Sequence, residues 1–164
     1  MTRAAVTKQL FADEIIRLAK DRPITQISVT ELCRACGTTR QSFYYHFHDK
    51  YDLVAWIYLQ DLERATKEHQ LGPDALYGLL SRMYDKGDFY RNALLDNSQN
   101  NLMAYVIESQ TDILLNALTK KHHGKPTDDL RLAVRYHAYG MLGIIADWLG
   151  GGSTRTTCGR WPSS

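Results

Sequence analysis

Apolar residues recur at three- and four-residue spacings through most of this chain, and this spacing constrains the fold more than any other feature. In residues 6–20 the pattern is carried by Leu10, Phe11, Ile15 and Leu18, with charged residues between them. Such a period places the apolar side chains on one face of an α-helix. The sequence has no useful length of the alternation that is typical of β-strands. We therefore predict an all-α fold.

Three boundary signals lie between residues 21 and 37. Pro23 ends the first helix, because proline disfavours helical geometry at the residue before it. Ser28 and Glu31 form a capping-box pattern, S-V-T-E, which predicts a short second helix from about residue 29 to residue 35. Gly37 supplies a left-handed or tight position that stops this helix.

A third short helix is expected directly after the turn, capped by Thr38 or Thr39 and running to Phe47. Asp49 is a good N-cap for a long fourth helix. The buried stripe of this helix is expected to be Leu53, Trp56, Ile57, Leu59, Leu62 and Ala65. Further helices are expected from Asp74 to Lys86-Gly87, where the glycine ends the helix, over residues 102–121 and over residues 128–149.

Charge is nearly balanced over the chain but unevenly distributed. The net charge is +2, and residues 1–50 carry eight Lys or Arg against five Asp or Glu. This modest excess points to the front of the chain, but it carries little weight alone, because a contact patch needs the right few positive groups in the right place. With three cysteines, no apolar run typical of a secretory signal and no stretch of eighteen apolar residues, we expect a cytoplasmic protein without a membrane partner.

The third helix carries the residues that indicate a function. Two short helices joined by a tight turn let the second lie in the major groove of DNA. Phe43 and Phe47 are four residues apart and are expected to point into the core. The other positions are hydrogen-bond formers that we expect to contact DNA, namely Thr39, Arg40, Gln41, Ser42, Tyr44, Tyr45 and His46, followed by Lys50.

The chemistry of these side chains differs. Arg40 is suited to bidentate contact with guanine and Gln41 to adenine, whereas Tyr44, His46 and Lys50 are better placed as phosphate ligands. Polar residues on an exposed helix are usually only solvated. Two adjacent exposed tyrosines on a short helix are hard to explain by solvation alone.

Residues 39–50, T-R-Q-S-F-Y-Y-H-F-H-D-K, resemble the TetR family pattern S-R-x-T-F-Y-Y-H-F-x-x-K. The resemblance covers residues 8–57 and departs at Thr38, where an aliphatic residue is usual. It implies phosphate contacts by Tyr44, His46 and Lys50, and groove-facing positions for Arg40, Gln41 and Tyr45. It also implies operator DNA as the partner, a homodimer, and a small-molecule effector or a co-regulator protein.

Three segments, 40–58, 88–108 and 140–151, are similar to the TetR subgroup of dihydroxyacetone kinase regulators. That similarity implies a regulator or co-regulator of a small metabolic operon. TetR proteins commonly continue past an ADWL-like segment into a last apolar helix, whereas this chain runs into GGGSTRTTCGRWPSS. We expect the usual final helix to be absent or replaced.

The predicted organisation has three parts. Residues 1–50 form a helix-turn-helix DNA-binding domain of three helices, residues 51–149 form a helical domain for regulation and dimerisation, and residues 150–164 form a flexible tail. Candidates for an effector site are Tyr84, Tyr105, Tyr136, His137, Tyr139 and Trp148. Aromatic residues at helical spacing are more often core than ligand site, so both interpretations stay open.

Two other chemistries are disfavoured by the sequence. Cys33 and Cys36 form a CxxC pair, but a structural zinc site needs four converging ligands and no second pair occurs, so we expect both cysteines in the core and no metal or other cofactor. The four residues that could act as acid or base, His122, His123, Asp128 and Asp129, lie about a Gly/Pro turn without a nucleophile elbow, phosphate loop or HExxH motif. We predict no enzymatic activity. The alternative function is a helical co-regulator that acts through protein contacts without operator selectivity.

Overall fold

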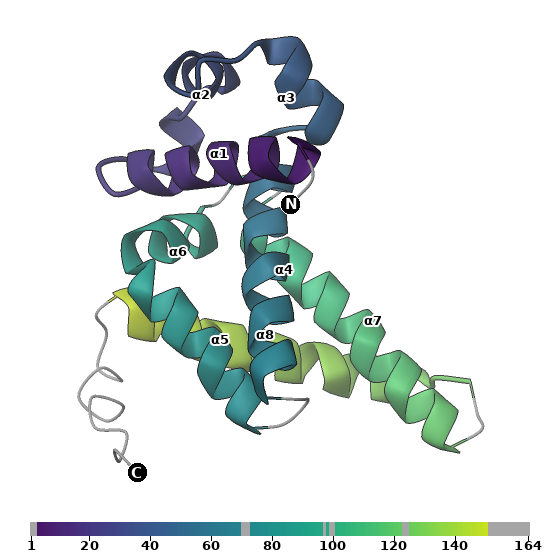
Figure 1. Ribbon diagram of the computed structural model, residues 1–164. Helices are drawn as coiled ribbons and strands as arrows, with labels where there is room; N and C mark the ends of the chain where they lie inside the picture. The colour runs from purple at the N-terminus through teal and green to yellow at the C-terminus, as the bar shows by residue number, and fades with distance from the viewer. Residues whose placement is uncertain (1–2, 70–72, 97, 99–100, 123–124, 151–164) are drawn as a thin grey trace. The chain divides into compact units, whose positions relative to one another are not determined.

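A computed structural model of the chain describes residues 3–69, 73–96, 98, 101–122 and 125–150 (Figure 1). Within these ranges the regular secondary structure is helical and contains no β-strand, so the prediction of an all-α fold is confirmed. The elements are α1 (Arg3–Leu18), the 3₁₀ helix η1 (Ile24–Gln26), α2 (Val29–Ala35), α3 (Arg40–His46), α4 (Lys50–His69), α5 (Pro73–Asp85), α6 (Gly87–Leu94), α7 (Leu102–His122) and α8 (Asp128–Gly150).

The chain divides into two compact units, residues 1–102 and residues 103–164. The first unit contains α1 to α6, and within it α1 packs on α4 while α4 packs on α5. The boundary predicted after residue 50 therefore falls inside the first unit. Of the predicted tail, residues 151–164 lie outside the described residues.

An aromatic cluster forms the core beneath α3. The ring centroids of Phe11 and Phe43 are 5.1 Å apart in an edge-to-face arrangement, and Phe47 lies 6.5 Å from Phe11 and 5.7 Å from Phe43. All three side chains are buried, as predicted for Phe43 and Phe47. Burying a side chain of this size contributes about 1.5–3 kcal/mol, so the cluster fixes how α3 sits on α1.

The caps of the short helices follow the predicted pattern closely. The Ser28 hydroxyl accepts from the Glu31 amide at 3.2 Å, and the Thr39 hydroxyl accepts from the Ser42 amide at 3.2 Å. Gly37 between them has a φ of +62°, which favours glycine. One part differs from prediction, because the Glu31 carboxylate pairs with the Arg22 guanidinium rather than reaching back to Ser28.

The start of α4 is also capped as predicted. The Asp49 carboxylate accepts from the amides of Tyr51 at 2.8 Å and Asp52 at 2.9 Å. Along the predicted stripe of α4, Leu53, Ile57 and Ala65 are buried. Leu59 is 39% exposed, so its predicted burial is wrong; Tyr58, the preceding residue, is buried instead.

Helix α6 was missing from the sequence prediction, which treated Gly87 only as the end of the preceding helix. Gly87 does separate two helices, but α6 begins at that residue. The pattern that identifies α6 is short, with Phe89, Tyr90, Ala93 and Leu94 buried along one side of it.

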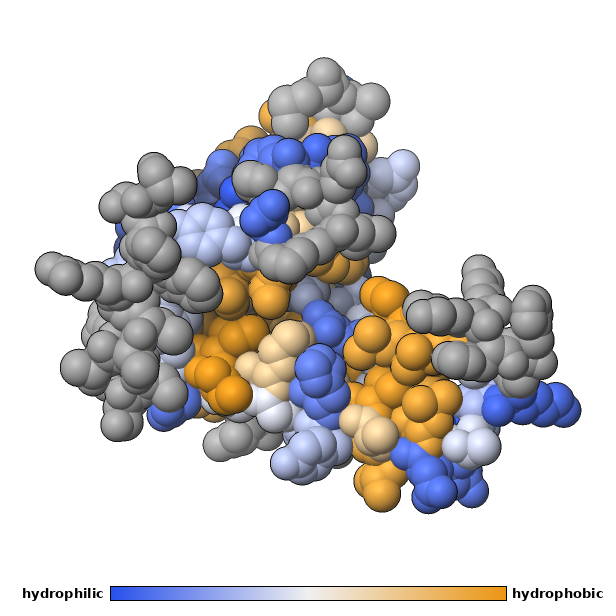
Figure 2. Space-filling model, turned by 90° about the horizontal axis from the view of Figure 1, so that it is seen from below, coloured by the Kyte–Doolittle hydropathy of each residue, from blue (hydrophilic) through white to orange (hydrophobic). Residues whose placement is uncertain are grey.

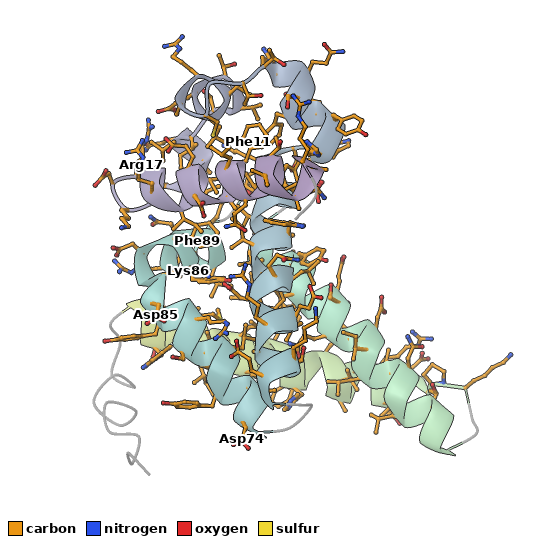
Figure 3. The ribbon with its side chains drawn as sticks, in the orientation of Figure 1. Phe11, Arg17, Asp74, Asp85, Lys86 and Phe89 are labelled. Carbon is orange, nitrogen blue, oxygen red and sulfur yellow. The ribbon has the colours of Figure 1, made fainter. Side chains whose placement is uncertain are left out.

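A buried ionic network holds the α5–α6 junction against α4. Lys86 lies between α5 and α6 (Figure 3). Asp61 on α4 is only 1% exposed, and the Lys86 ammonium lies 2.6 Å from both of its carboxylate oxygens. The Tyr90 hydroxyl donates to the Asp61 Oδ2 atom at 2.5 Å. A buried carboxylate needs partners of this kind, because leaving it unpaired in the core is strongly unfavourable.

In the second unit, α8 is apolar on two sides. Its buried side consists of Val134, Ala138, Leu142, Ile145, Ala146 and Leu149. Large apolar residues that it leaves exposed are Leu132, Tyr136, Tyr139 and Ile144. Figure 2 shows apolar side chains gathered over part of the face seen from below. None of the helices in the described ranges is long and apolar enough to cross a lipid bilayer.

Candidate DNA-binding site

The core contacts of α3 determine which of its side chains face outward. Successive residues of an α-helix are separated by roughly 100° around its axis. Since Phe43 and Phe47 point into the core, Gln41 and Tyr45 occupy the opposite side of α3. Tyr45 is 82% exposed and Gln41 is also exposed. These two side chains therefore lie on the face of α3 that points away from the core.

Arg40 and Tyr44 form one flank of this outward face. The guanidinium of Arg40 lies 5.8 Å from the centroid of the Tyr44 ring, and its Nη2 atom donates to the Tyr44 hydroxyl at 3.5 Å. Both side chains are exposed. Stacking on the ring orients the guanidinium along the helix, which presents a cation and a hydroxyl together.

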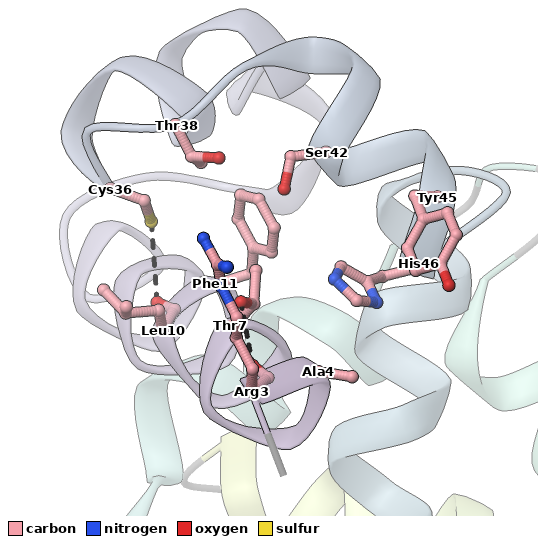
Figure 4. Close-up of a pocket in the computed structure, with 10 residues that line it drawn as sticks. All are labelled: Arg3, Ala4, Thr7, Leu10, Phe11, Cys36, Thr38, Ser42, Tyr45 and His46. Atoms are coloured by element: carbon pink, nitrogen blue, oxygen red, sulfur yellow. Dashed lines mark hydrogen bonds between the residues drawn. The ribbon is translucent and has the colours of Figure 1, made fainter.

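Ser42 and His46 form the other flank, which borders a cavity of about 370 Å³ between α1, the turn after α2, and α3 (Figure 4). Both side chains are half-buried, and the His46 ring lies 5.0 Å from the ring of Tyr45. The cavity is lined by Arg3, Ala4, Thr7, Leu10, Phe11, Cys36, Thr38, Ser42, Tyr45 and His46.

Lys50, predicted as a phosphate contact, donates to the backbone of the segment before α2. Its ammonium donates to the carbonyl oxygens of Ile24 at 2.8 Å, Thr25 at 2.9 Å and Ile27 at 2.9 Å. These three bonds use all the protons that a lysine ammonium can donate. Burial lowers the pKa of Lys50, an effect opposed by Asp96 and Asp49. In this geometry Lys50 positions η1, the segment that leads into α2, and its phosphate contact stays a prediction.

Two family models match the chain. One, for the bacterial regulatory proteins of the tetR family, matches residues 4–57. The other, for a transcriptional regulator C-terminal region, matches residues 73–157, more than half of the chain. The chain belongs to the TetR family of transcriptional regulators. Its α2 and α3 are the helix-turn-helix of the family's N-terminal DNA-binding domain, as predicted.

Known TetR-type proteins resemble parts of the chain to different degrees. The HTH-type transcriptional regulator AcrR of Shigella flexneri is 36% identical over 55 residues, which are 34% of this chain and 26% of that protein. The match thus spans about a quarter of the length of this curated relative. A solved structure, the dihydroxyacetone kinase operon activator DhaS, superposes with a TM-score of 0.61 at 20% identity, over 93% of this chain and 89% of that chain. This likeness shows a common fold.

The six effector candidates lie on three helices and differ in exposure. Tyr84 on α5 is exposed, and Tyr105 on α7 is half-buried. On α8, Tyr136, His137 and Tyr139 are exposed, while Trp148 is half-buried. The cavity beside α3 contains none of these six residues in its lining.

The CxxC pair of this TetR head is packed as predicted for Cys33, which is buried, while Cys36 is half-buried. The Cys36 thiol donates to the Leu10 carbonyl at 3.6 Å. Burial, with smaller contributions from Glu14 and others, raises the pKa of Cys36 to about 11, and burial also raises the pKa of Cys33. Metal ligation requires the thiolate, which this environment disfavours.

In the described part of the chain, no three His, Cys, Asp or Glu side chains are grouped so that they could hold a metal ion. Of the residues weighed as acid or base groups, Asp128 and Asp129 are exposed in the first turn of α8. The side chain of His122 and the whole of His123 lie outside the described residues.

Sequence reasoning overlooked the contribution of α1 to this site. Arg3 and Thr7 line the cavity beside Ser42 and His46, although neither was predicted as a contact. The signal was a cation in the first turn of a helix that has no acidic residue there. Such a helix end attracts anions.

Proposed function

We propose that the chain is an operator-binding transcriptional regulator that places α3 in the major groove. The observation that carries this proposal is the arrangement of α3, in which buried Phe43 and Phe47 orient Gln41 and Tyr45 outward. A helix held in this way by its core contacts offers hydrogen-bonding side chains to base edges without losing its packing.

Each remaining side chain of the helix has a place in this proposal. Thr39 caps α3 and Arg40 is its first residue, so Arg40 reaches a guanine while Tyr44 contacts the adjacent backbone. Gln41 pairs with an adenine, and Tyr45 contacts a base or sugar beside it. Ser42 and His46 face the backbone of the opposite strand. Lys50 acts indirectly, by fixing η1 and thereby the approach of α2.

The regulator acts as a homodimer in this proposal, with α8 as the contact between copies. Leu132, Tyr136 and Tyr139 follow one another at four- and three-residue spacing, so they form one exposed stripe. Gly143 continues the stripe, with open space where a Cβ would be, which lets a second helix approach closely. Two reading heads related by a twofold axis read a palindromic operator.

A small-molecule effector or a co-regulator protein controls the dimer in this proposal, and the site of action is the cytoplasm, where operator DNA lies. Similarity of residues 40–58, 88–108 and 140–151 to the dihydroxyacetone kinase regulator subgroup supports a metabolic operon as the target. The fold shared with the dihydroxyacetone kinase operon activator DhaS is compatible with this assignment.

Binding-site selection from random duplex DNA, at a stated salt concentration, tests the proposal. We expect a palindromic site to be enriched by the full chain and lost in the triple variant Arg40→Ala, Gln41→Ala, Tyr45→Ala. Each bidentate base contact is worth about 1–3 kcal/mol of discrimination. A matched triple variant of exposed α4 residues, Glu63→Ala, Arg64→Ala and Lys67→Ala, is expected to select the original site. Enrichment of no site by the unaltered protein would favour a co-regulator that acts through protein contacts.

A further inference from the structure

We propose that the cavity between α1 and α3 is an anion site that receives one backbone phosphate of the bound duplex, with Arg3 as its positive charge. This inference rests on the proposed DNA-binding function and adds to it a residue outside the helix-turn-helix. The cavity and the groove-facing surface share the side chain of Tyr45.

The charge of the cavity lining favours an anion. Arg3 is the lining residue that carries a permanent charge, and no Asp or Glu is among the ten residues that line the cavity. The volume of about 370 Å³ is roughly ten times the share of one water molecule in the liquid, so a phosphate group fits with some of its hydration. In Figure 4 the Arg3 guanidinium and the His46 imidazole both point into the space between α1 and α3.

The neutral groups of the lining add hydrogen-bond donors over an apolar floor. Ser42 and Tyr45 bring hydroxyls and His46 brings a ring nitrogen, all from α3. Leu10 and Phe11 of α1 form apolar parts of the wall. Apolar walls lower the local dielectric, so the attraction between a guanidinium and a phosphate is stronger there than on an open surface.

The helix that supplies Arg3 reinforces the positive potential. Arg3 is the first residue of α1, a helix of 16 residues without an acidic residue in its first turn. The amides at such an end lack intrahelical partners and carry the positive end of the helix dipole. The positive potential of this helix end adds to that of Arg3. The main argument for the site is the composition of the cavity lining.

Acidic neighbours determine which end of the cavity holds the anion. Glu14 and Asp13 act on the Cys36 thiol, so the end of the cavity at Cys36 has a negative potential nearby. The end formed by Arg3, Ser42 and His46 is therefore the favourable one. It adjoins Tyr45 on the outward face of α3, and a helix lying in a groove about 12 Å wide has a phosphate backbone on either side. Tyr44 faces one backbone, and the cavity faces the other.

The first test compares the salt dependence of binding for the full chain and three variants. We expect Arg3→Ala to lower affinity roughly three- to tenfold on every duplex and to reduce the slope of log K against log salt by about 0.9 for each bound head. Arg3→Lys keeps the charge and is expected to restore most of the slope. Arg17→Ala removes the same charge from the far end of α1, where Arg17 pairs with Glu14 at 2.6 Å, and is expected to leave the slope unchanged.

A second measurement locates the phosphate. Single backbone phosphates of the duplex are replaced in turn by neutral methylphosphonate. At one position in each half-site, we expect the replacement to lower the DNA affinity of the unaltered protein but to leave the affinity of Arg3→Ala unchanged. An unaltered protein that binds DNA while Arg3→Ala shows the same slope and the same methylphosphonate profile would overturn the inference and leave the proposed function standing. Failure of the unaltered protein to bind any duplex would remove the proposed function itself.

Inorganic phosphate distinguishes the two sources of the anion. Titration of phosphate against the full chain, followed through the His46 ring resonances, reports occupation of the cavity without DNA. Weak, Arg3-dependent shifts together with the changed salt slope support a site built for the backbone. Tight, Arg3-dependent binding of free phosphate with an unchanged slope on DNA would show a site for a soluble anion and would overturn the inference.

Discussion

The ammonium nitrogen of Lys50 lies 2.8 Å from the carbonyl oxygen of Ile24, a residue 26 positions earlier in the chain. Two more carbonyls, of Thr25 and Ile27, accept from the same ammonium. The first residue of α4 thereby holds the connection between α1 and α2. The helix-turn-helix is thus stabilised by the hydrogen bonds of Lys50 to the segment before α2, as well as by its aromatic core.

We predict that Lys50→Met lowers the free energy of unfolding by about 1–3 kcal/mol, because half-buried carbonyls lose a charged donor while the aliphatic stem is kept. Urea unfolding measures this loss, and Lys67→Met on the exposed side of α4 is the control. Salt dependence of DNA binding is expected to stay unchanged. An unaltered stability combined with a smaller salt slope would instead support the phosphate contact that the sequence indicated.

Tyr90 provides a prediction for alkaline pH. Burial, followed by the charge of Asp61, raises the pKa of Tyr90 well above its ordinary value, so the folded protein keeps this phenol protonated while the unfolded chain ionises near pH 10. Its contribution to stability is present below about pH 10 and is lost as the pH rises further. We expect Tyr90→Phe to flatten this decline and to destabilise the protein by about 1–3 kcal/mol at neutral pH, where Asp61 loses a donor.

Urea midpoints between pH 7 and pH 11 measure both effects. Tyr45→Phe is the matched control, because Tyr45 is 82% exposed and, in the absence of DNA, is expected to change neither quantity. A Tyr90→Phe protein with the same alkaline decline as the unaltered protein would contradict the role of the buried phenol.

The thiol of Cys36 is predicted to be unreactive in the folded protein. With a pKa of about 11, its thiolate fraction at pH 8 is about 100-fold smaller than that of an ordinary thiol of pKa 9. The greater nucleophilicity of the more basic thiolate offsets part of this difference, so alkylation is expected to be about 10- to 100-fold slower than in the unfolded chain. Mass spectrometry of a Cys158→Ser protein treated with iodoacetamide, with and without urea, follows the modification at Cys33 and Cys36. Rapid modification in the folded protein would revive the redox interpretation of the CxxC pair.

The exposed stripe of α8 leads to a prediction about assembly. Tyr136→Glu places a carboxylate in the proposed contact between copies, where burial of a charge is costly. We expect a monomer by analytical ultracentrifugation, with the helical content unchanged because the side chain is exposed within the chain. His137→Glu, an exposed neighbour off the stripe, is expected to keep the assembly state of the unaltered protein. Equal masses for both variants and the unaltered protein would exclude this face as the contact.

Local signals accounted for the parts of the fold that the sequence predicted well. Ser28, Gly37, Thr39 and Asp49 act within four residues of their own positions, so their capping and turn roles are legible from neighbouring letters. The buried aromatics of α3 follow from their four-residue spacing. The short helix α6 was missed because its glycine satisfied the prediction of a helix end equally well.

Contacts between distant segments account for what the sequence did not predict about the site. The sequence around Lys50 does not indicate that its ammonium contacts three carbonyls of residues 24–27, because those contacts depend on the path of η1. Arg3 was overlooked for the same reason, because its place beside His46 exists only once α1 and α3 pack together. A family pattern assigns a role to each position, whereas the hydrogen-bond partners of a side chain depend on the residues that surround it in the fold.

Asn92 on α6 has a consequence for chimaeric regulators. Its amide donates to the carbonyl of Ala19 at 2.6 Å and to that of Arg22 at 3.5 Å, at the end of α1. A head transplanted as residues 1–50 would carry these carbonyls away from their donor, and would separate α1 from the α4 surface on which it packs. Exchange of operator specificity between such proteins is therefore better made by grafting the few outward residues of α3, or by joining the chains beyond Leu102, than by cutting after the helix-turn-helix.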